Sequence, residues 1–152
     1  YRIISFDGGG ICGSLTAVLL KRLSIKFPDL INKTNLFVGT STGSFIALSL
    51  ANNISPEKIA ELFCLRNGKF IFTPCHLNLL DPKYSNENLK KLLHSIFPAK
   101  LRLKDLGQHV LIPSFKVIDS DTKRWRPIFF NNFPNIFNPS IVASFGFNSM
   151  FI

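Results

Sequence analysis

Two short apolar runs near the start of the chain are each followed by a glycine-containing loop and then by a helical pattern. Residues 2–6 and 36–38 are the apolar runs and are typical of buried strands, while residues 14–26 and 42–51 are expected to be helices. Two successive strand–loop–helix units predict a parallel pair of strands joined by a helical crossover. Both loops should then lie at the carboxyl ends of their strands.

The helical pattern of residues 14–26 depends on leucines at helical spacing. The residues that share one face of this helix are Leu15, Leu19, Leu20 and Leu23. We expect the helix to end before Pro28, because proline has no N–H with which to continue the hydrogen-bonded ladder.

Further elements follow along the chain. Ser55 and Pro56 predict a helix start, because serine can cap free backbone N–H groups and proline suits the first turn. That helix should reach about residue 66. The other expected elements are a short strand at 70–72, an amphipathic helix at 86–97 with Leu89, Leu92, Leu93 and Ile96 on one side, and paired strands at 109–118 and 125–130.

Length and composition place the chain among ordinary α/β domains. It has 152 residues, of which 46% are hydrophobic, and no apolar run approaches the roughly 20 residues of a membrane span. No signal segment opens the chain, and its first residue is Tyr1 rather than Met, so we expect a piece of a longer polypeptide. The expected location is the cytoplasm or a peripheral membrane position, with export left open.

The chain is basic and contains few cysteines, and both features bear on its expected partners. Eighteen Lys and Arg face nine Asp and Glu, a formal charge of +9, which would suit an anionic membrane surface. The basic residues are scattered, with no run or recognition motif, so nucleic acid is not expected as a partner. Cys12, Cys64 and Cys75 are an odd number without metal-site spacing, so neither a disulfide framework nor a metal site is expected.

The segment 39–43, Gly-Thr-Ser-Thr-Gly, lies between the second apolar run and its helix. A serine with a glycine two residues away on each side, at a strand-to-helix junction, is typical of a nucleophile elbow. Gly39 and Gly43 permit the tight turn, and Ser41 then stands at a helix start, where backbone N–H groups favour developing negative charge. A plain loop that begins a helix is the alternative interpretation.

The first loop, residues 7–13, has the sequence Asp-Gly-Gly-Gly-Ile-Cys-Gly. Its Gly8-x-Gly10-x-x-Gly13 spacing matches a dinucleotide fingerprint, but that site needs an acidic residue at the end of the next strand, and Asp29 precedes that strand. No Gly-Lys-Ser/Thr follows, so a phosphate loop is excluded. Since both loops are expected at one edge of the sheet, the glycine N–H groups are better suited to an oxyanion hole facing Ser41.

The glycine loop followed by the elbow, 31 residues on (39 minus 8), resembles the patatin-like phospholipase family. The resemblance covers most of residues 2–130. It implies a three-layer α/β/α domain with a mainly parallel central sheet, here a single domain over 1–152 that lacks its dyad-aspartate region. It also implies hydrolysis of ester bonds in phospholipids or other lipids by a serine–aspartate dyad, with no metal or cofactor.

Carried over by residue, the resemblance makes Ser41 the nucleophile and gives the oxyanion hole to Gly8, Gly9 and Gly10. Gly13, Gly39 and Gly43 are the remaining motif glycines, and Asp7 matches a leading aspartate whose role is structural rather than catalytic.

The chain departs from the family pattern at two places. Cys12 stands where the family usually has Arg or Lys. We expect it to be an inert, buried thiol, and a reactive thiol at a helix start is the alternative. The family's second motif, Asp-Gly-Gly or Asp-Gly-Ala, is absent after Gly43, and the acidic residues Asp81, Asp105, Asp119 and Asp121 do not match it. The dyad aspartate is therefore expected beyond Ile152. If that part also supplies strands, this chain has an unpaired sheet edge and exposed apolar surface.

Other interpretations stay open at this point. His76, His94 or His109 could replace the aspartate as base, although none has a position that favours it. A second hypothesis is a catalytically inactive member that keeps the fold and binds lipid or a protein partner. A nucleotide-binding module is the third.

Overall fold

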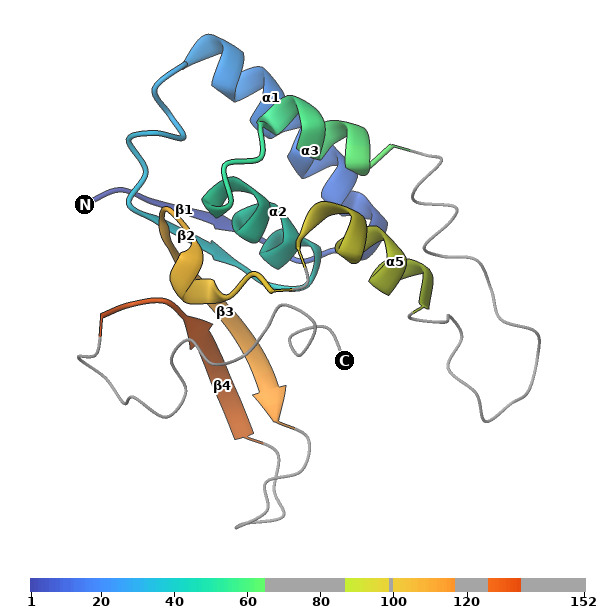
Figure 1. The fold of residues 1–152 in the computed structure, drawn as a ribbon. Helices are drawn as coiled ribbons and strands as arrows, with labels where there is room; N and C mark the ends of the chain where they lie inside the picture. The colour runs from blue at the N-terminus through green and yellow to red at the C-terminus, as the bar shows by residue number, and fades with distance from the viewer. Residues whose placement is uncertain (65–86, 99, 117–125, 135–152) are drawn as a thin grey trace.

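The computed structural model describes residues 1–64, 87–98, 100–116 and 126–134, and Figure 1 shows their arrangement. In chain order the elements are β1 (Ile3–Phe6), the 3-10 turn η1 (Gly10–Cys12), α1 (Gly13–Lys26), β2 (Leu36–Gly39), α2 (Thr42–Ala51), α3 (Pro56–Leu62), α5 (Glu87–Ile96), the 3-10 turn η2 (Leu103–Asp105), β3 (His109–Lys116) and β4 (Arg126–Asn131).

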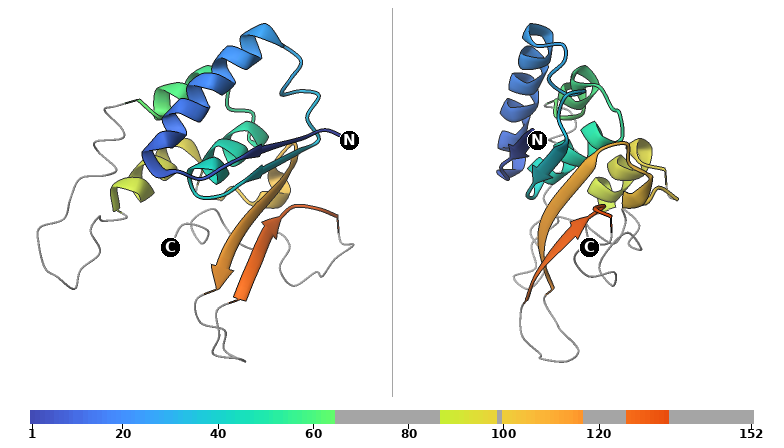
Figure 2. Two further views of the ribbon diagram at one scale, coloured as in Figure 1. Left: turned by 180° about the vertical axis from the view of Figure 1, so that it is seen from behind. Right: turned by 90° about the vertical axis from the view of Figure 1, so that its left-hand side faces the viewer.

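The four strands form one sheet in the order β1-β2-β3-β4. β1 is parallel to β2 and β2 is parallel to β3, whereas β3 and β4 pair as antiparallel neighbours. The helices between the first strands therefore make the expected crossover, and the α/β class with a mainly parallel sheet is confirmed. Figures 1 and 2 show that β3 and β4 extend away from the helices and are turned relative to β1 and β2, as the twist of a sheet requires.

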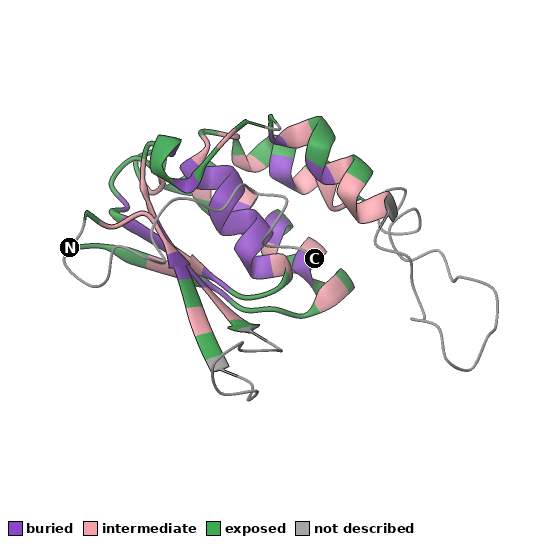
Figure 3. Ribbon diagram, turned by 60° about the horizontal axis from the view of Figure 1, so that its bottom comes forward, coloured by how far each residue is buried: buried purple, intermediate pink, exposed green. Residues whose placement is uncertain are grey.

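Helix α2 is the centre of the core. Every residue from Gly43 to Ala51 is buried, which Figure 3 shows as a continuous purple helix. α2 packs against β1, β2 and β3 and contacts the helix pair α1–α3. The cross-strand row Ile4, Phe37 and Val110 supplies the sheet side of this core, and Phe37 and Val110 are fully buried. A helix that is apolar all round must be enclosed by other elements, and the sequence of α2 therefore dictates its place.

The leucine face of α1 is the main correction to the sequence-based expectations for the fold. Only Leu20 of the four leucines is buried, whereas Leu15 and Leu19 are 73% and 55% exposed. The helix instead buries its small residues Gly13 and Ala17 and lies against α3. The leucines occur at helical spacing, but they do not form the surface of α1 that packs against α3.

One edge and one face of the sheet carry apolar side chains at the surface. Among the described strands β1 pairs with β2 alone, so its other edge has no strand partner among them. Ile3 of β1, Phe115 of β3 and Phe129 of β4 point to the same side of the sheet by register and are each about half exposed or more.

Most of the expected element boundaries agree with the structure. Ser55 caps α3 by accepting a hydrogen bond from the N–H of Lys58 at 3.3 Å, but α3 ends at Leu62, four residues earlier than expected. On α5, Leu93 is buried and the apolar side is the expected one. The strand expected at 70–72 lies outside the described residues.

None of the helices that the structure describes is long and apolar enough to cross a membrane.

Candidate active site

Ser41 lies in a tight turn between β2 and α2. Its backbone has φ 51° and ψ −124°, and residues other than glycine rarely adopt such a positive φ. The N–H of Gly43 donates to the carbonyl of Thr40 at 2.8 Å and the N–H of Ser44 to the carbonyl of Ser41 at 2.9 Å, which closes the turn. A strained non-glycine residue in such a turn is characteristic of a nucleophile elbow, because the strain aims the side chain away from the sheet.

The glycines of the elbow are required by the close approach of backbone segments. A Cβ at Gly39 would lie 2.6 Å from the nitrogen of Ser44 and would also meet the carbonyl of Gly43. A Cβ at Gly43 would collide with the carbonyl of Phe6 and lie 2.9 Å from that of Asp7. The start of α2 therefore packs directly on the end of β1, and no side chain fits between them.

The glycine loop after β1 lies beside Ser41, as the parallel topology predicts. A Cβ built at Gly8 would be 3.0 Å from the Cβ of Ser41, so the backbone of Gly8 runs against the serine. The N–H of Gly8 donates to the Oγ1 of Thr40 at 3.0 Å. Gly10 has φ 56°, a conformation in which glycine is unstrained. The contact of the Thr40 side chain could not be predicted from the sequence, because it joins residues 32 positions apart.

Gly13, the last glycine of the loop, serves a packing role at the start of α1. A Cβ there would lie 3.0 Å from both the Phe63 ring and the Cβ of Thr42. The first turns of α1 and α2 therefore touch through this glycine.

The surroundings of Ser41 are open to solvent on the loop side. Gly8, Gly9, Thr40 and Ser41 are all exposed, and Gly10 is half-buried. Ser41 is the N-cap of the ten-residue helix α2, where unpaired N–H groups and the helix dipole give a positive potential. An oxygen that gains negative charge beside Ser41 would be stabilised there.

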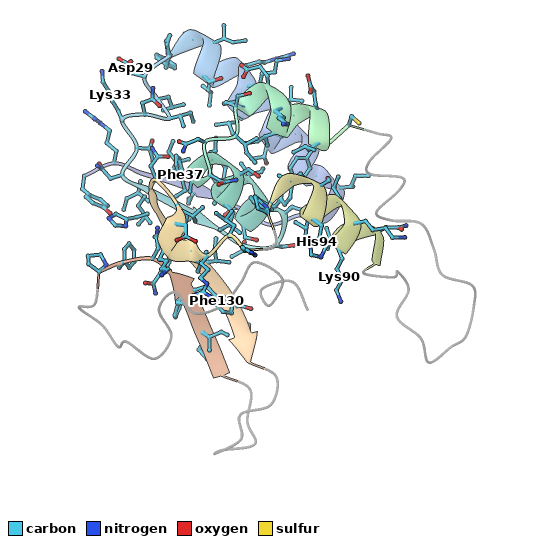
Figure 4. All side chains as sticks on the ribbon, in the orientation of Figure 1. Asp29, Lys33, Phe37, Lys90, His94 and Phe130 are labelled. Carbon is cyan, nitrogen blue, oxygen red and sulfur yellow. The ribbon has the colours of Figure 1, made fainter. Side chains whose placement is uncertain are left out.

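A base for Ser41 is not found among the described residues, and none of them is hydrogen-bonded to its hydroxyl. His109 starts β3 opposite Leu36, three residues before Gly39, so it lies toward the other end of the strands. His94 is exposed on α5 (Figure 4). His76 lies outside the described residues.

The acidic side chains with a described partner are engaged in local contacts. Asp29 is 2.6 Å from the Nζ of Lys33 in the loop after α1, away from α5 in Figure 4. Asp105 accepts a hydrogen bond from the N–H of Arg102 at 2.9 Å and thereby caps a turn. The other candidates from the sequence, Asp81, Asp119 and Asp121, lie outside the described residues.

The cysteine in the glycine loop differs from expectation. Cys12 is a free, exposed thiol at the N-cap of α1, so the expectation of a buried thiol was wrong. The loop turns it outward because Gly13, not Cys12, makes the contact with α2 and Phe63. Cys64 is also free and exposed, and Cys75 lies outside the described residues. No group of residues suited to a metal ion occurs in the described part of the chain.

The comparisons with known proteins agree on one family. The model of the family "Patatin-like phospholipase" matches residues 4–149. The chain is 38% identical to the protein "Protein teg" of Priestia megaterium over 142 residues, which cover 88% of this chain and 42% of that protein. It is also 38% identical to the "Putative sporulation hydrolase CotR" of Bacillus subtilis over 139 residues, again 88% of this chain and 42% of that protein.

More distant relatives have names that indicate different activities. A "cGAMP-activated phospholipase" of Escherichia coli is 26% identical over 147 residues, 85% of this chain and 38% of that protein. A "Probable inactive patatin-3-Kuras 1" of Solanum tuberosum is 25% identical over 142 residues, 84% of this chain and 36% of that protein. The chain thus spans about two fifths of the length of these relatives, which carry further residues beyond the matched region.

Proposed function

Because this chain belongs to the patatin-like phospholipase family, we propose that the protein is a serine acyl hydrolase that cleaves ester bonds of phospholipids or other lipids. The observation that supports this most directly is the position of the glycine loop. Gly8 runs against an exposed Ser41 held at positive φ, so an ester carbonyl that reaches Ser41 also meets the amides of the loop.

The proposed reaction has two steps. The Oγ of Ser41 attacks the ester carbonyl carbon, its proton passes to a base, and the carbonyl oxygen becomes an oxyanion held by loop amides. The ester C–O bond then breaks, the alcohol leaves with the proton, and water hydrolyses the acyl-serine to the free acid. No metal or cofactor takes part in this scheme.

The base in this proposal is an aspartate supplied by polypeptide that follows Ile152. Two observations support it: the Ser41 hydroxyl has no hydrogen-bond partner among the described residues, and the relatives are more than twice as long as the matched region. A serine–aspartate dyad needs only one proton acceptor within hydrogen-bond reach of Oγ.

We expect a fluorophosphonate probe to label the full polypeptide on Ser41. The oxygen of an activated serine attacks the phosphorus of the probe, and fluoride leaves. Labelling therefore identifies the nucleophile, and the lipid substrate need not be known. Proteolysis and mass spectrometry should place the adduct on the peptide that carries Ser41, and heat-unfolded protein should not react. Labelling that persists in Ser41→Ala, or that maps to another serine, would refute the assignment.

A catalytically inactive member that binds lipid or a protein partner is the second candidate. The absence of a described partner for the Ser41 hydroxyl and the "probable inactive" relative favour it. It predicts a folded full polypeptide that the probe does not label, whereas an Asp-Gly-Gly or Asp-Gly-Ala motif after Ile152 would count heavily against it.

The proposed substrate lies in membranes, and we propose that the basic chain contacts anionic lipid there as a peripheral protein, without nucleic acid as a partner. With a formal charge of +9, binding to vesicles that contain phosphatidylserine should fall steeply between low salt and about 0.5 M salt, because screening shortens the range of the attraction. Co-sedimentation measures this. Binding that is equal for neutral and anionic vesicles would show that charge plays no part.

A further inference from the structure

Thr40 holds three segments of the active-site region together. Its N–H donates to the carbonyl of Phe6 at the end of β1 at 3.3 Å, and its carbonyl accepts from the N–H of Gly43 at 2.8 Å. Its Oγ1 accepts from the N–H of Gly8 at 3.0 Å. Any residue other than proline would keep both backbone groups at this position. The side-chain bond needs a hydroxyl.

The hydrogen bond to Thr40 makes the Gly8 amide differ from the other two glycine amides of the loop. The N–H of Gly8 is directed at Thr40 and is therefore not free to donate to a substrate oxygen. The N–H groups of Gly9 and Gly10 have no acceptor among the described residues, and Gly9 is exposed. The Gly8 backbone also lies so close to Ser41 that the bond fixes the distance from the serine to the start of the loop.

We propose that Thr40 is a positioning residue whose hydroxyl anchors Gly8, and that the oxyanion hole consists of the Gly9 and Gly10 amides without that of Gly8. This inference rests on the proposed acyl hydrolysis. It reduces the expected oxyanion-hole donors from three glycine amides to two. Loop amides act on charge that develops in the transition state, so a small displacement lowers the rate of reaction more than it weakens substrate binding.

The first test replaces Thr40 in the full polypeptide and follows hydrolysis of a soluble p-nitrophenyl ester. Thr40→Val has nearly the same shape and no acceptor, and should lower kcat about 10- to 100-fold while KM changes less than about twofold. Thr40→Ser keeps the acceptor and should restore most of the rate. A Thr40→Val rate equal to that of the unmutated protein, or equal losses in the two variants, would overturn the proposal.

The second test needs no enzymatic activity, and its main comparison needs no variant. In the unmutated protein labelled with 15N-glycine, the amide of Gly8 should be protected from hydrogen exchange at least about tenfold more than those of Gly9 and Gly10. Equal protection factors would overturn the anchoring of Gly8 by Thr40. In Thr40→Val the extra protection of Gly8 should disappear while the melting temperature stays close to that of Thr40→Ser.

The two tests separate the failure of this inference from the failure of the proposed function. If no form hydrolyses the ester or reacts with a fluorophosphonate, acyl hydrolysis is wrong, and the exchange measurement still decides whether Thr40 holds Gly8. If Ser41→Ala is inactive but Thr40→Val is fully active, the hydrolase assignment holds and the positioning role of Thr40 is wrong. Should Thr40→Val fail to fold, the exchange comparison in the unmutated protein decides.

Discussion

Replacing Ser41 with alanine is expected to lower kcat/KM for ester hydrolysis by the full polypeptide about 10⁴-fold or more. The Oγ is the atom that forms the acyl intermediate, and the remaining loop amides and helix dipole can only polarise a bound ester. Hydrolysis of a p-nitrophenyl ester measures the loss. Ser24→Ala is the matched control, because that hydroxyl donates to the carbonyl of Lys21 within α1. A residual rate within tenfold of the unmutated protein would show that another residue is the nucleophile.

A second substitution at the same position tests the strain of the elbow. Ser41→Gly should be as inactive as Ser41→Ala, but it should raise the free energy of unfolding relative to Ser41→Ala by about 1 kcal/mol or more. The reason is that alanine at φ 51° keeps the strained backbone of Ser41, whereas glycine adopts this φ without steric cost. Equal stabilities of the two variants would mean that the turn at Ser41 stores no strain.

Replacing Gly43 with alanine should have the largest effect on stability, a loss of about 3 kcal/mol or more in the free energy of unfolding. The new Cβ would collide with the carbonyl of Phe6, and no flexible side chain is present to yield. Helix α2 would have to move away from β1, which opens the centre of the core. Urea unfolding of the full polypeptide measures the loss as a shift of the midpoint.

Gly107→Ala is the matched control for this substitution. The nearest atom to a Cβ at Gly107 is the Nδ2 of Asn53 at 3.5 Å, which is an ordinary contact. Its free energy of unfolding should change by less than about 1 kcal/mol. Equal midpoint shifts for Gly43→Ala and Gly107→Ala would mean that α2 does not pack on β1 as closely as described.

Much of the fold could be predicted from sequence because its causes are local. The apolar run that becomes β2, the continuous apolar stretch of α2 and the Ser55 cap each depend on neighbouring residues. The parallel pairing of β1 with β2 followed from two successive strand–loop–helix units, since a helical crossover joins parallel strands. The same argument predicts that the glycine loop lies beside Ser41, because the carboxyl ends of parallel strands share one edge of the sheet.

The expectations that failed concerned which neighbours a residue meets. Leucine spacing in α1 predicted a shared leucine face, but α1 buries Gly13, Ala17 and only Leu20 of the four leucines. Cys12 was expected to be buried and is exposed, because the contact with the start of α2 is made by the residue after it. Periodicity describes one element at a time, and burial depends on the element packed against it.

Local sequence was sufficient to identify the candidate nucleophile, Ser41, and the glycines that let two backbone segments meet, because glycine spacing indicates a turn directly. The folded chain was needed to show that the Gly8 amide donates to Thr40, while the amides of Gly9 and Gly10 have no acceptor among the described residues. That distinction depends on a hydrogen bond between residues 32 positions apart, across two strands. No local pattern records such a contact, since it exists only once β1 and β2 are paired.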